Sequence, residues 1–330
     1  MTVAVVILNW NGRSLLEQFL PSVVRYSSEA TVYVADNAST DESVSFVSEN
    51  YPSVKIIRNK VNGGYAKGYN DALRNLDEDL FVLLNSDVEV TEGWLNPAIS
   101  LFQKDPDLAA AQPKILDYQN KSKFEYAGAG GGFIDKLGYP YCRGRIFNTI
   151  ETDHGQYDDT AKIFWATGAC LFVRRNSYGE AGGFDEDFFA HQEEIDLCWR
   201  LQATGSSVMY IGNSVVYHLG GGTLKASNPR KTFYNFRNTL LMLLKNVKGV
   251  KVYGIIFQRL VLDGIAGLMF LLQGKGYHFI AILKAHFSFY SLFPLFLKKR
   301  KKHATNLTYS KIKSIVWKYY ISKKRNFNEL

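Results

Sequence analysis

The sequence of 330 residues has little of what builds several classes of protein. It has three cysteines, Cys142, Cys170 and Cys198, and no two of them are close enough in the chain to suggest a structural zinc site or a disulfide framework. An odd number of widely spaced cysteines fits a reducing compartment. The N-terminal residues lack the basic segment and the small-residue cleavage site of a signal peptide, so export is not expected.

Long apolar runs are also missing. No run reaches the roughly 18 charge-free residues of a confident membrane-spanning helix. The longest near the C-terminus, residues 285–297, has 13 residues and contains Pro294. Hydrophobic residues nevertheless make up 46% of the chain and charged residues 21%, which excludes a disordered or low-complexity protein. The length corresponds to about two domains.

Acidic residues are scarce in one segment only. Residues 298–330 contain 11 Lys or Arg and one acid, whereas residues 1–297 contain 28 Lys or Arg and 30 Asp or Glu. The formal charge of +8 therefore belongs to the C-terminal segment. Anionic membrane surfaces attract such a segment. No nucleic-acid-binding motif accompanies it, so a nucleic-acid partner is not expected.

The first 116 residues alternate short apolar runs with amphipathic stretches. The apolar runs predict buried strands at residues 3–8, 31–35, 54–57, 80–84 and 108–112. The stretches between them predict helices at residues 15–26, 42–49, 65–75 and 94–103. Continuous apolar strands separated by helices predict an α/β fold, with a mostly parallel sheet covered by helices on both faces.

The next 130 or so residues are less regular. Residues 117–165 are rich in Gly and Tyr without a clear period, which predicts a long loop or irregular hairpin near the site. The expected elements that follow are a strand at residues 166–173, an acid-opened helix at 192–203, short strands at 208–211 and 215–217, and a helix at 231–246.

Polar residues follow the predicted strands at the edge where such a sheet binds ligands. They are Asn9 and Asn11 after the first strand, Asp36 after the second, Asn62, Gly63 and Lys67 after the third, and Asn85, Ser86 and Asp87 after the fourth. Together they predict a nucleotide pocket. Helix capping can explain some of these residues, whereas Asp36 and Asp87 have no such local role.

Several ordered motifs resemble those of family 2 glycosyltransferases. The motifs are ILNWNG at residues 7–12, VADNASTD at 34–41, LLNSDVE at 83–89, GGFDE at 182–186 and EEIDLCWR at 193–200. The likeness covers about residues 1–245 and is closest to the bacterial rhamnosyltransferase-like branch. It implies a GT-A fold, a nucleotide-diphospho-sugar donor, a divalent metal (Mn²⁺ or Mg²⁺) and inversion at the anomeric carbon.

The departing nucleoside diphosphate carries charge that a hard divalent cation can stabilise. Asp87 is the expected ligand, and Asn85 replaces the aspartate more usual in the family. The resemblance adds His218, which precedes Gly220–Gly222, near the metal and diphosphate. A neutral imidazole would be a second ligand, and a protonated one would offset phosphate charge; a hydrogen-bonded, partly buried histidine is the alternative. Asn9, Asn11 and Asp36 are expected near the nucleoside, with Lys67 and Arg230 as weaker candidates for the diphosphate.

Inverting transfer also needs a base that takes a proton from the acceptor hydroxyl. In the family this base is the second acid of a Glu-Asp pair, which matches Glu193-Glu194 here and assigns the role to Glu194. Glu193 and Asp196 remain alternatives, because acids in the first turn of a helix also stabilise it through the helix dipole. Repulsion among the three acids would raise some of their pKa values, which suits a base.

Beyond residue 246 the resemblance fades. Residues 252–272 and 277–297 are apolar and aromatic, are interrupted by Arg259, Asp263 and Lys284, and precede the basic run at 298–302. They favour helices lying in a membrane interface; packing on the catalytic body and an oligomer contact are the alternatives. The expected domains are a catalytic domain at 1–245, divided into a nucleotide-binding half (1–116) and an acceptor half (117–245), and a helical, membrane-associating region at 246–330.

The expected function is metal-assisted, inverting transfer of a sugar to a hydroxyl of a bacterial surface glycan, with a lipid-linked acceptor, on the cytoplasmic face of the cell membrane. One alternative is a sugar-nucleotide nucleotidyltransferase, although the Gly-rich, Arg-containing loop expected after the first strand is missing. The other is a catalytically inactive glycan-binding relative, suggested by Asn85 and Glu194 in place of aspartates.

Overall fold

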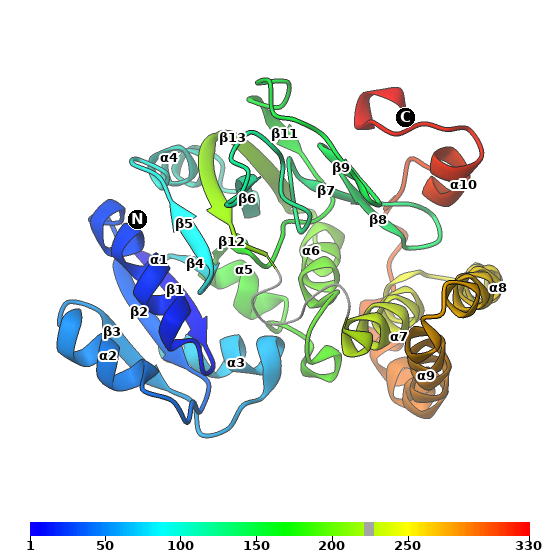
Figure 1. Cartoon of the computed structure of the whole chain (residues 1–330), viewed down its shortest axis with the longest axis horizontal. Coiled ribbons are helices and arrows are strands. Elements are labelled where there is room, and N and C mark those ends of the chain that lie inside the picture. The colour runs from blue at the N-terminus through cyan, green and yellow to red at the C-terminus, as the bar shows by residue number, and fades with distance from the viewer. Residues whose placement is uncertain (221–227) are drawn as a thin grey trace.

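A central sheet organises the chain, of which this computed structural model describes residues 1–220 and 228–330 (Figure 1). Its strands are β1 (Val3–Asn9), β2 (Thr31–Asp36), β3 (Lys55–Arg58), β4 (Leu80–Asn85), β5 (Val88–Val90), β6 (Leu108–Asp117), β11 (Thr160–Lys162), β12 (Cys170–Arg174) and β13 (Ser207–His218). They lie in the order β11-β13-β6-β12-β4-β1-β2-β3, and β5 pairs with β13.

The sheet is mixed, with a parallel part at each side. β4, β1, β2 and β3 are parallel neighbours, and β6 is parallel to β13. β12 joins the two parts because it runs antiparallel to both β4 and β6. The two short strands expected at 208–211 and 215–217 form the single strand β13, whose register shifts between Ile211 and Val215.

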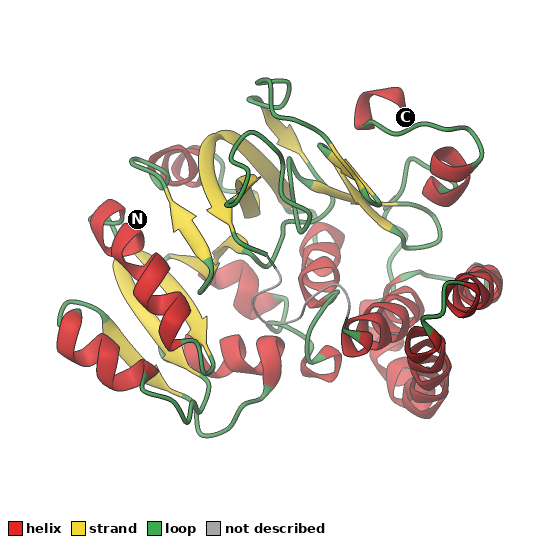
Figure 2. Ribbon diagram, viewed as in Figure 1, coloured by secondary structure: helices red, strands yellow, loops and turns green. Residues whose placement is uncertain are grey.

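Helices cover both faces of this sheet (Figure 2). They include α1 (Arg13–Tyr26), α2 (Ser43–Asn50), α3 (Gly64–Leu73), α4 (Asn96–Lys104), α5 (Arg175–Glu180) and α6 (Glu193–Ala203). In β1, Val5 and Ile7 belong to the core cluster that includes α1, α2 and α4, while Ala4 and Val6 belong to the cluster that includes α3 and α6. Apolar residues on both sides of one strand explain its continuous apolar sequence, and the predicted α/β fold is confirmed.

Residues 117–165, predicted as a long loop or irregular hairpin, are more regular than expected. This segment contains a four-stranded antiparallel sheet of β7 (Gly132–Ile134), β8 (Pro140–Cys142), β9 (Arg145–Ile146) and β10 (Thr149–Ile150). Its glycines allow close packing: a Cβ on Gly132 would lie 2.0 Å from Cε2 of Trp165. Glycines selected for packing remove the alternating pattern by which a strand is recognised.

Within residues 228–330 the α-helices are α7 (Pro229–Asn246), α8 (Lys251–Leu272), α9 (Gly276–His303) and α10 (Ile315–Tyr320). By length and composition alone, α8 and α9 could each cross a membrane. The sequence did not indicate this, because neither helix contains a charge-free run of the expected length. Two charges within α8 face the body of the protein, because Arg259 pairs with Asp263 at 2.7 Å and donates to the Leu137 carbonyl at 3.2 Å.

Each of these two helices also exposes an apolar stripe. The exposed side chains are Phe257, Val261, Ile265, Leu268 and Leu272 on α8, and Tyr277, Ile280, Leu283, Phe287 and Tyr290 on α9. Within each helix they recur every three or four residues, so they share one face.

The basic C-terminal segment is folded against the catalytic body rather than free. Ile315 and Tyr319 of α10 pack with Tyr141 and Ile146 of the small sheet, and α10 lies beside β8 and β9 in Figure 1. The Ile315 amide donates to Asp135 Oδ2 at 2.8 Å. The segment predicted only to seek membranes therefore also completes the core of the small sheet.

Candidate active site

The ends of β1, β2 and β4 bring the predicted nucleotide residues to one edge. Asn9 lies opposite Asp36, and Leu8 lies opposite Asn85. Asp36 Oδ2 accepts a hydrogen bond from the Ser39 amide at 3.1 Å, whereas the buried Oδ1 has no partner within the described residues. A buried acceptor oxygen without a partner suits a ligand that donates a hydroxyl or an N–H group.

The side chains of other residues expected at the nucleotide form hydrogen bonds within the loops. Asn11 Oδ1 accepts from the Thr40 amide at 2.7 Å. Asn62 Oδ1 accepts from Asn37 Nδ2 and from the Gly64 amide, both at 3.0 Å. These two asparagines shape the edge of the pocket, because their oxygens are already occupied.

The remaining donor-side candidates differ in accessibility. Lys67 pairs with Asp71 at 2.9 Å and with Glu186 at 3.8 Å, so its ammonium group is already engaged. Gly63 packs against the Lys67 side chain, and the half-buried Ser86 lies near Gly12. Arg230 is exposed in the first turn of α7. Of the glycines after His218, Gly221 and Gly222 lie outside the described residues.

A carboxylate and an imidazole meet beside these strand ends. β5 pairs with the end of β13, so that His218 lies opposite Val88. This pairing places His218 Nε2 at 3.1 Å from Asp87 Oδ1 and at 3.5 Å from Asn85 Nδ2. On the other side of the ring, Nδ1 lies 3.3 Å from Glu125 Oε2. Burial alone would lower the pKa of His218, but the Glu125 and Asp87 carboxylates outweigh it and raise that pKa to about 10.

These residues suit a divalent metal that is shared with a substrate. A carboxylate oxygen and a neutral imidazole nitrogen are ligands that Mn²⁺ accepts. Because the pKa of His218 is raised, the metal would have to replace the proton on Nε2. Within residues 1–220 and 228–330, no cluster of three or more His, Cys, Asp or Glu could hold a metal alone. Two protein ligands completed by phosphate oxygens is how Mg²⁺-like ions are usually held at nucleotide sites. Glu125 would fix the ring orientation, as carboxylates behind metal-binding histidines do.

Two carboxyl groups stand at the start of α6. Glu193 is 4% exposed and Glu194 is half-buried, and one oxygen of each is enclosed without a partner in the described structure. Burial raises the pKa of Glu194 to about 7. Burial and the neighbouring Glu194 raise the pKa of Glu193 well above its ordinary value. Glu194 is therefore the more accessible of the two, and its protonation changes near neutral pH.

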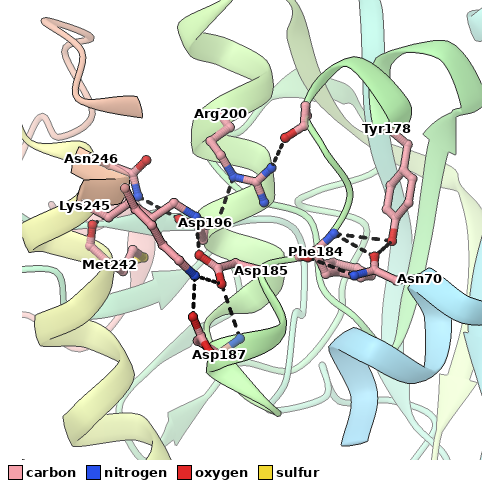
Figure 3. A network of polar contacts seen from close by, with 12 residues as sticks. Asn70, Tyr178, Phe184, Asp185, Asp187, Asp196, Arg200, Met242, Lys245 and Asn246 are labelled. Carbon is pink, nitrogen blue, oxygen red and sulfur yellow. Dashed lines mark hydrogen bonds and ion pairs between the residues drawn. The ribbon is translucent and has the colours of Figure 1, made fainter. Parts of the chain in front are cut away.

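Asp196, the third acid of this helix, is not available as a base. It is fully buried and accepts from Arg200 at 2.9 Å, Lys245 at 2.8 Å and Asn246 at 2.8 Å (Figure 3). Burial alone would raise its pKa, but Lys245 and Arg200 hold it well below the ordinary range. The prediction that listed Asp196 among the possible bases is wrong, because these partners keep the carboxylate ionised and enclosed.

The same network reaches the GGFDE motif. Lys245 also pairs with Asp185 at 2.7 Å (Figure 3). Lys299 of α9 pairs with Asp185 and Asp187. A buried ion pair thus joins the start of α6 to the end of α7, and the partly exposed Lys299 adds the end of α9 to this network.

The loop before Glu193 has an unusual backbone. Phe189, His191 and Gln192 all have positive φ, at 64°, 69° and 75°. Such conformations are costly for residues other than glycine and persist where the surroundings hold them. Asn238 Nδ2 of α7 holds this loop by donating to the carbonyls of Phe188, Ala190 and His191, at 2.7 to 3.0 Å.

Two further contacts fix the loop at its other side. Arg237 donates to the Asp187 and Phe188 carbonyls at 3.0 Å. The Tyr65 amide, at the start of α3, donates to the Phe189 carbonyl at 2.9 Å. Because α3 follows the donor-side loop, this bond ties the two glutamates to the nucleotide edge of the sheet.

Comparisons with known proteins agree with this arrangement. Residues 4–180 match the model of the family described as Glycosyl transferase family 2. This chain belongs to that family. The expected family and the GT-A fold are confirmed.

Individual relatives of this family 2 glycosyltransferase extend the comparison. It is 28% identical over 233 residues to the N-acetylglucosaminyl-diphospho-decaprenol L-rhamnosyltransferase of Mycobacterium tuberculosis, covering 65% of this chain and 75% of that protein. Its fold is similar to GalNAc-T7 with UDP, GalNAc and Mn²⁺, at a TM-score of 0.61 and 16% identity, covering 98% of this chain and 57% of that one. It is also similar to a mannosyltransferase from Pyrobaculum calidifontis in complex with GDP-Man and Mn²⁺, at a TM-score of 0.54 and 15% identity, covering 87% and 86%.

Sequence reasoning about this glycosyltransferase overlooked three residues around the site. Glu125 lies beside the glycine-rich stretch and belongs to no motif, and Asn238 and Lys245 lie in a predicted helix without a motif. A buried polar residue within an apolar helical face was the one available signal for Asn238 and Lys245, because such groups need partners.

Proposed function

We propose that this protein is an inverting, metal-dependent glycosyltransferase that moves a sugar from a nucleotide-diphospho-sugar to a hydroxyl of a lipid-linked bacterial glycan. One observation carries this proposal: the Asp87–His218 pair and the accessible Glu194 carboxyl are both anchored to the edge of the sheet where β1, β2 and β4 end. The relatives' names support the donor and acceptor classes.

In the proposed mechanism each residue acts on a stated atom. Asp36 receives hydrogen bonds from the nucleoside through its unpartnered oxygen. Asp87 and His218 would hold a divalent cation, which would supply positive charge beside the diphosphate. Glu194 takes the proton of the acceptor hydroxyl as the hydroxyl oxygen attacks the anomeric carbon and the bond from that carbon to the nucleoside diphosphate breaks. Glu193 stays protonated beside it. Direct attack inverts the anomeric configuration and needs no covalent glycosyl-enzyme.

A thermal-shift panel of nucleoside diphosphates and nucleotide sugars, with and without Mn²⁺ or Mg²⁺, tests the donor and the metal. The matching nucleotide should raise the melting temperature only with metal, since a ligand stabilises the state that binds it. Asp87→Asn should lose this metal-dependent shift. The shift in wild type surviving excess chelator would contradict metal dependence, and turnover that requires pyrophosphate would favour the nucleotidyltransferase alternative.

The acceptor proposal includes a membrane surface. The exposed stripes of α8 and α9 offer the apolar contact, and Lys298, Lys301 and Lys302 at the end of α9 are exposed. Apolar insertion beside basic residues is how interfacial helices bind anionic bilayers. We therefore place the protein on the cytoplasmic face of the cell membrane, peripheral to it.

Vesicle sedimentation tests this placement. Full-length protein should bind anionic vesicles, bind less in high salt, and retain a fraction that salt does not remove, because insertion is not screened. Phe257→Glu should weaken the salt-resistant fraction. Phe233→Glu is not a suitable control, because Phe233 lies in α7 and its replacement would alter that helix. Glu180→Gln, an exposed change on α5, is the matched control. Absence of vesicle binding would assign the two stripes to an oligomer contact.

A further inference from the structure

One buried arginine differs from the others near the site. Arg145 on β9 is 5% exposed, donates from Nη2 to Cys142 Sγ at 3.3 Å, and has an enclosed Nε without a partner. In the described part of the chain no carboxylate forms an ion pair with it, whereas a carboxylate pairs with each of Arg143, Arg200 and Arg259. The Glu125 carboxylate acts on the charge of Arg145, but it also acts on those of Lys231 and His218. One carboxylate is thus shared by three cationic groups, and a ligand anion would balance the remaining positive charge.

A second cation stands over the same aromatic ring. The Arg145 guanidinium lies 4.6 Å from the centre of the Tyr126 ring, and Lys231 Nζ lies 5.9 Å from it. Tyr126 is 45% exposed, so solutes can reach this place. Burial and the charge of Arg145 lower the pKa of Lys231 more than the Glu125 carboxylate raises it. An anion between the two cations would favour the charged form of Lys231.

The cation pair lies near Glu125, on one side of the His218 ring, and Asp87 lies on the other side. Tyr126 directly follows Glu125, which faces one nitrogen of His218, while Asp87 faces the other nitrogen. A donor with its nucleoside at Asp36 would place its diphosphate at Asp87, across the ring from Glu125. We therefore assign the group that the cations bind to the other substrate.

The pair also borders the helices that expose apolar stripes. Lys231 precedes Thr232, whose hydroxyl lies 2.7 Å from His278 Nδ1 in the first turn of α9. The neighbouring Tyr277 belongs to the exposed stripe of α9. A molecule with its lipid along α8 and α9 and its sugar at Glu194 would thus pass the two cations.

We propose that Arg145 and Lys231 bind the phosphate group that joins the acceptor sugar to its lipid. This inference rests on the proposed function. It adds that the acceptor carries its phosphate next to the sugar to which the new sugar is transferred. Arginine and lysine together suit a diphosphate, because the guanidinium offers a planar pair of donors and the ammonium a compact charge.

A binding experiment tests the subsite without requiring transfer. Farnesyl diphosphate is titrated by calorimetry into full-length protein saturated with Mn²⁺ and with the nucleoside diphosphate that stabilises it most. Wild type should bind, Arg145→Gln and Lys231→Gln should each bind at least about tenfold more weakly, and Lys136→Gln, which removes an exposed cation of the small sheet, should bind as wild type. No binding by wild type, or equal binding by all four proteins, would overturn the inference.

A transfer experiment distinguishes binding of the acceptor phosphate from binding of the donor diphosphate. Two acceptors are compared, a short-chain N-acetylglucosaminyl-diphospho-lipid and the uncharged octyl N-acetylglucosaminide. The two variants should raise KM about tenfold for the first acceptor only, and Arg145→Lys should recover part of the loss. An equal rise for both acceptors, or weaker binding of the nucleoside diphosphate, would assign the cations to packing or to the donor. Transfer by wild type to neither acceptor would refute the proposed function, while the calorimetric result would still stand.

Discussion

Replacing Glu194 by glutamine should remove activity and increase stability at the same time. Burial raises the pKa of this carboxyl from 4.5 to about 7. In the unfolded chain the group loses its proton near pH 4.5, so between these values the folded state binds more protons and stability falls as the pH rises. The folded wild type therefore loses about 1 kcal/mol at pH 5 and about 3 kcal/mol at pH 8 through this group.

Urea denaturation at both pH values measures this difference. Glu194→Gln should exceed wild type in unfolding free energy by about 3 kcal/mol at pH 8 and by about 1 kcal/mol at pH 5. Glu180→Gln, an exposed change, should match wild type at both. Turnover of Glu194→Gln should fall by about 10²-fold or more, with nucleotide binding retained. A stability difference that does not depend on pH would refute the pKa argument, and full activity of the variant would refute the base.

Three further outcomes follow from the buried contacts. Lys245→Met should lower the free energy of unfolding by about 3–5 kcal/mol, because it leaves two buried carboxylates without their shared cation. The exposed Lys248→Met should change this free energy by less than about 0.5 kcal/mol. Equal effects of the two variants in urea denaturation would contradict the ion-pair reasoning. Asn238→Leu removes the donor to three loop carbonyls, so kcat should fall about tenfold with the donor KM unchanged, and a change in KM alone would contradict a positioning role. Glu193→Gln should keep measurable turnover. If Glu193→Gln is inactive while Glu194→Gln is active, Glu193 is the base instead of Glu194.

The sequence predicts those parts of the fold that depend on local pattern. β1, β2 and β4 are apolar on both faces, and this property alone places their ends, with Asn9, Asp36 and Asn85, at one edge. The small sheet of β7 to β10 escapes prediction because its strands are two or three residues long. Strands of that length carry no measurable period, so their pairing depends on contacts distant in sequence.

The same distinction applies within the site. The motif places three acids at the start of α6, but their chemistry depends on partners far along the chain. Asp196 has Lys245, 49 positions away, as an ion-pair partner, while Glu194 has none in the described structure. Glu125 likewise reaches His218 across 93 positions of sequence, since 218 − 125 = 93. Sequence pattern thus proposes which residues gather, and only the folded contacts decide which of them are free to react.

The position of β12 has a consequence for how the protein moves. Because Cys170–Arg174 pairs with β4 on one side and β6 on the other, β12 shares one hydrogen-bonded sheet with the strands of residues 1–116. A hinged opening at β12 would break these hydrogen bonds, so we expect substrates to enter through motion of loops. Amide hydrogen exchange in β1, β4, β12 and β6 should then proceed at one common slow rate, as a single cooperative unit, with or without nucleotide.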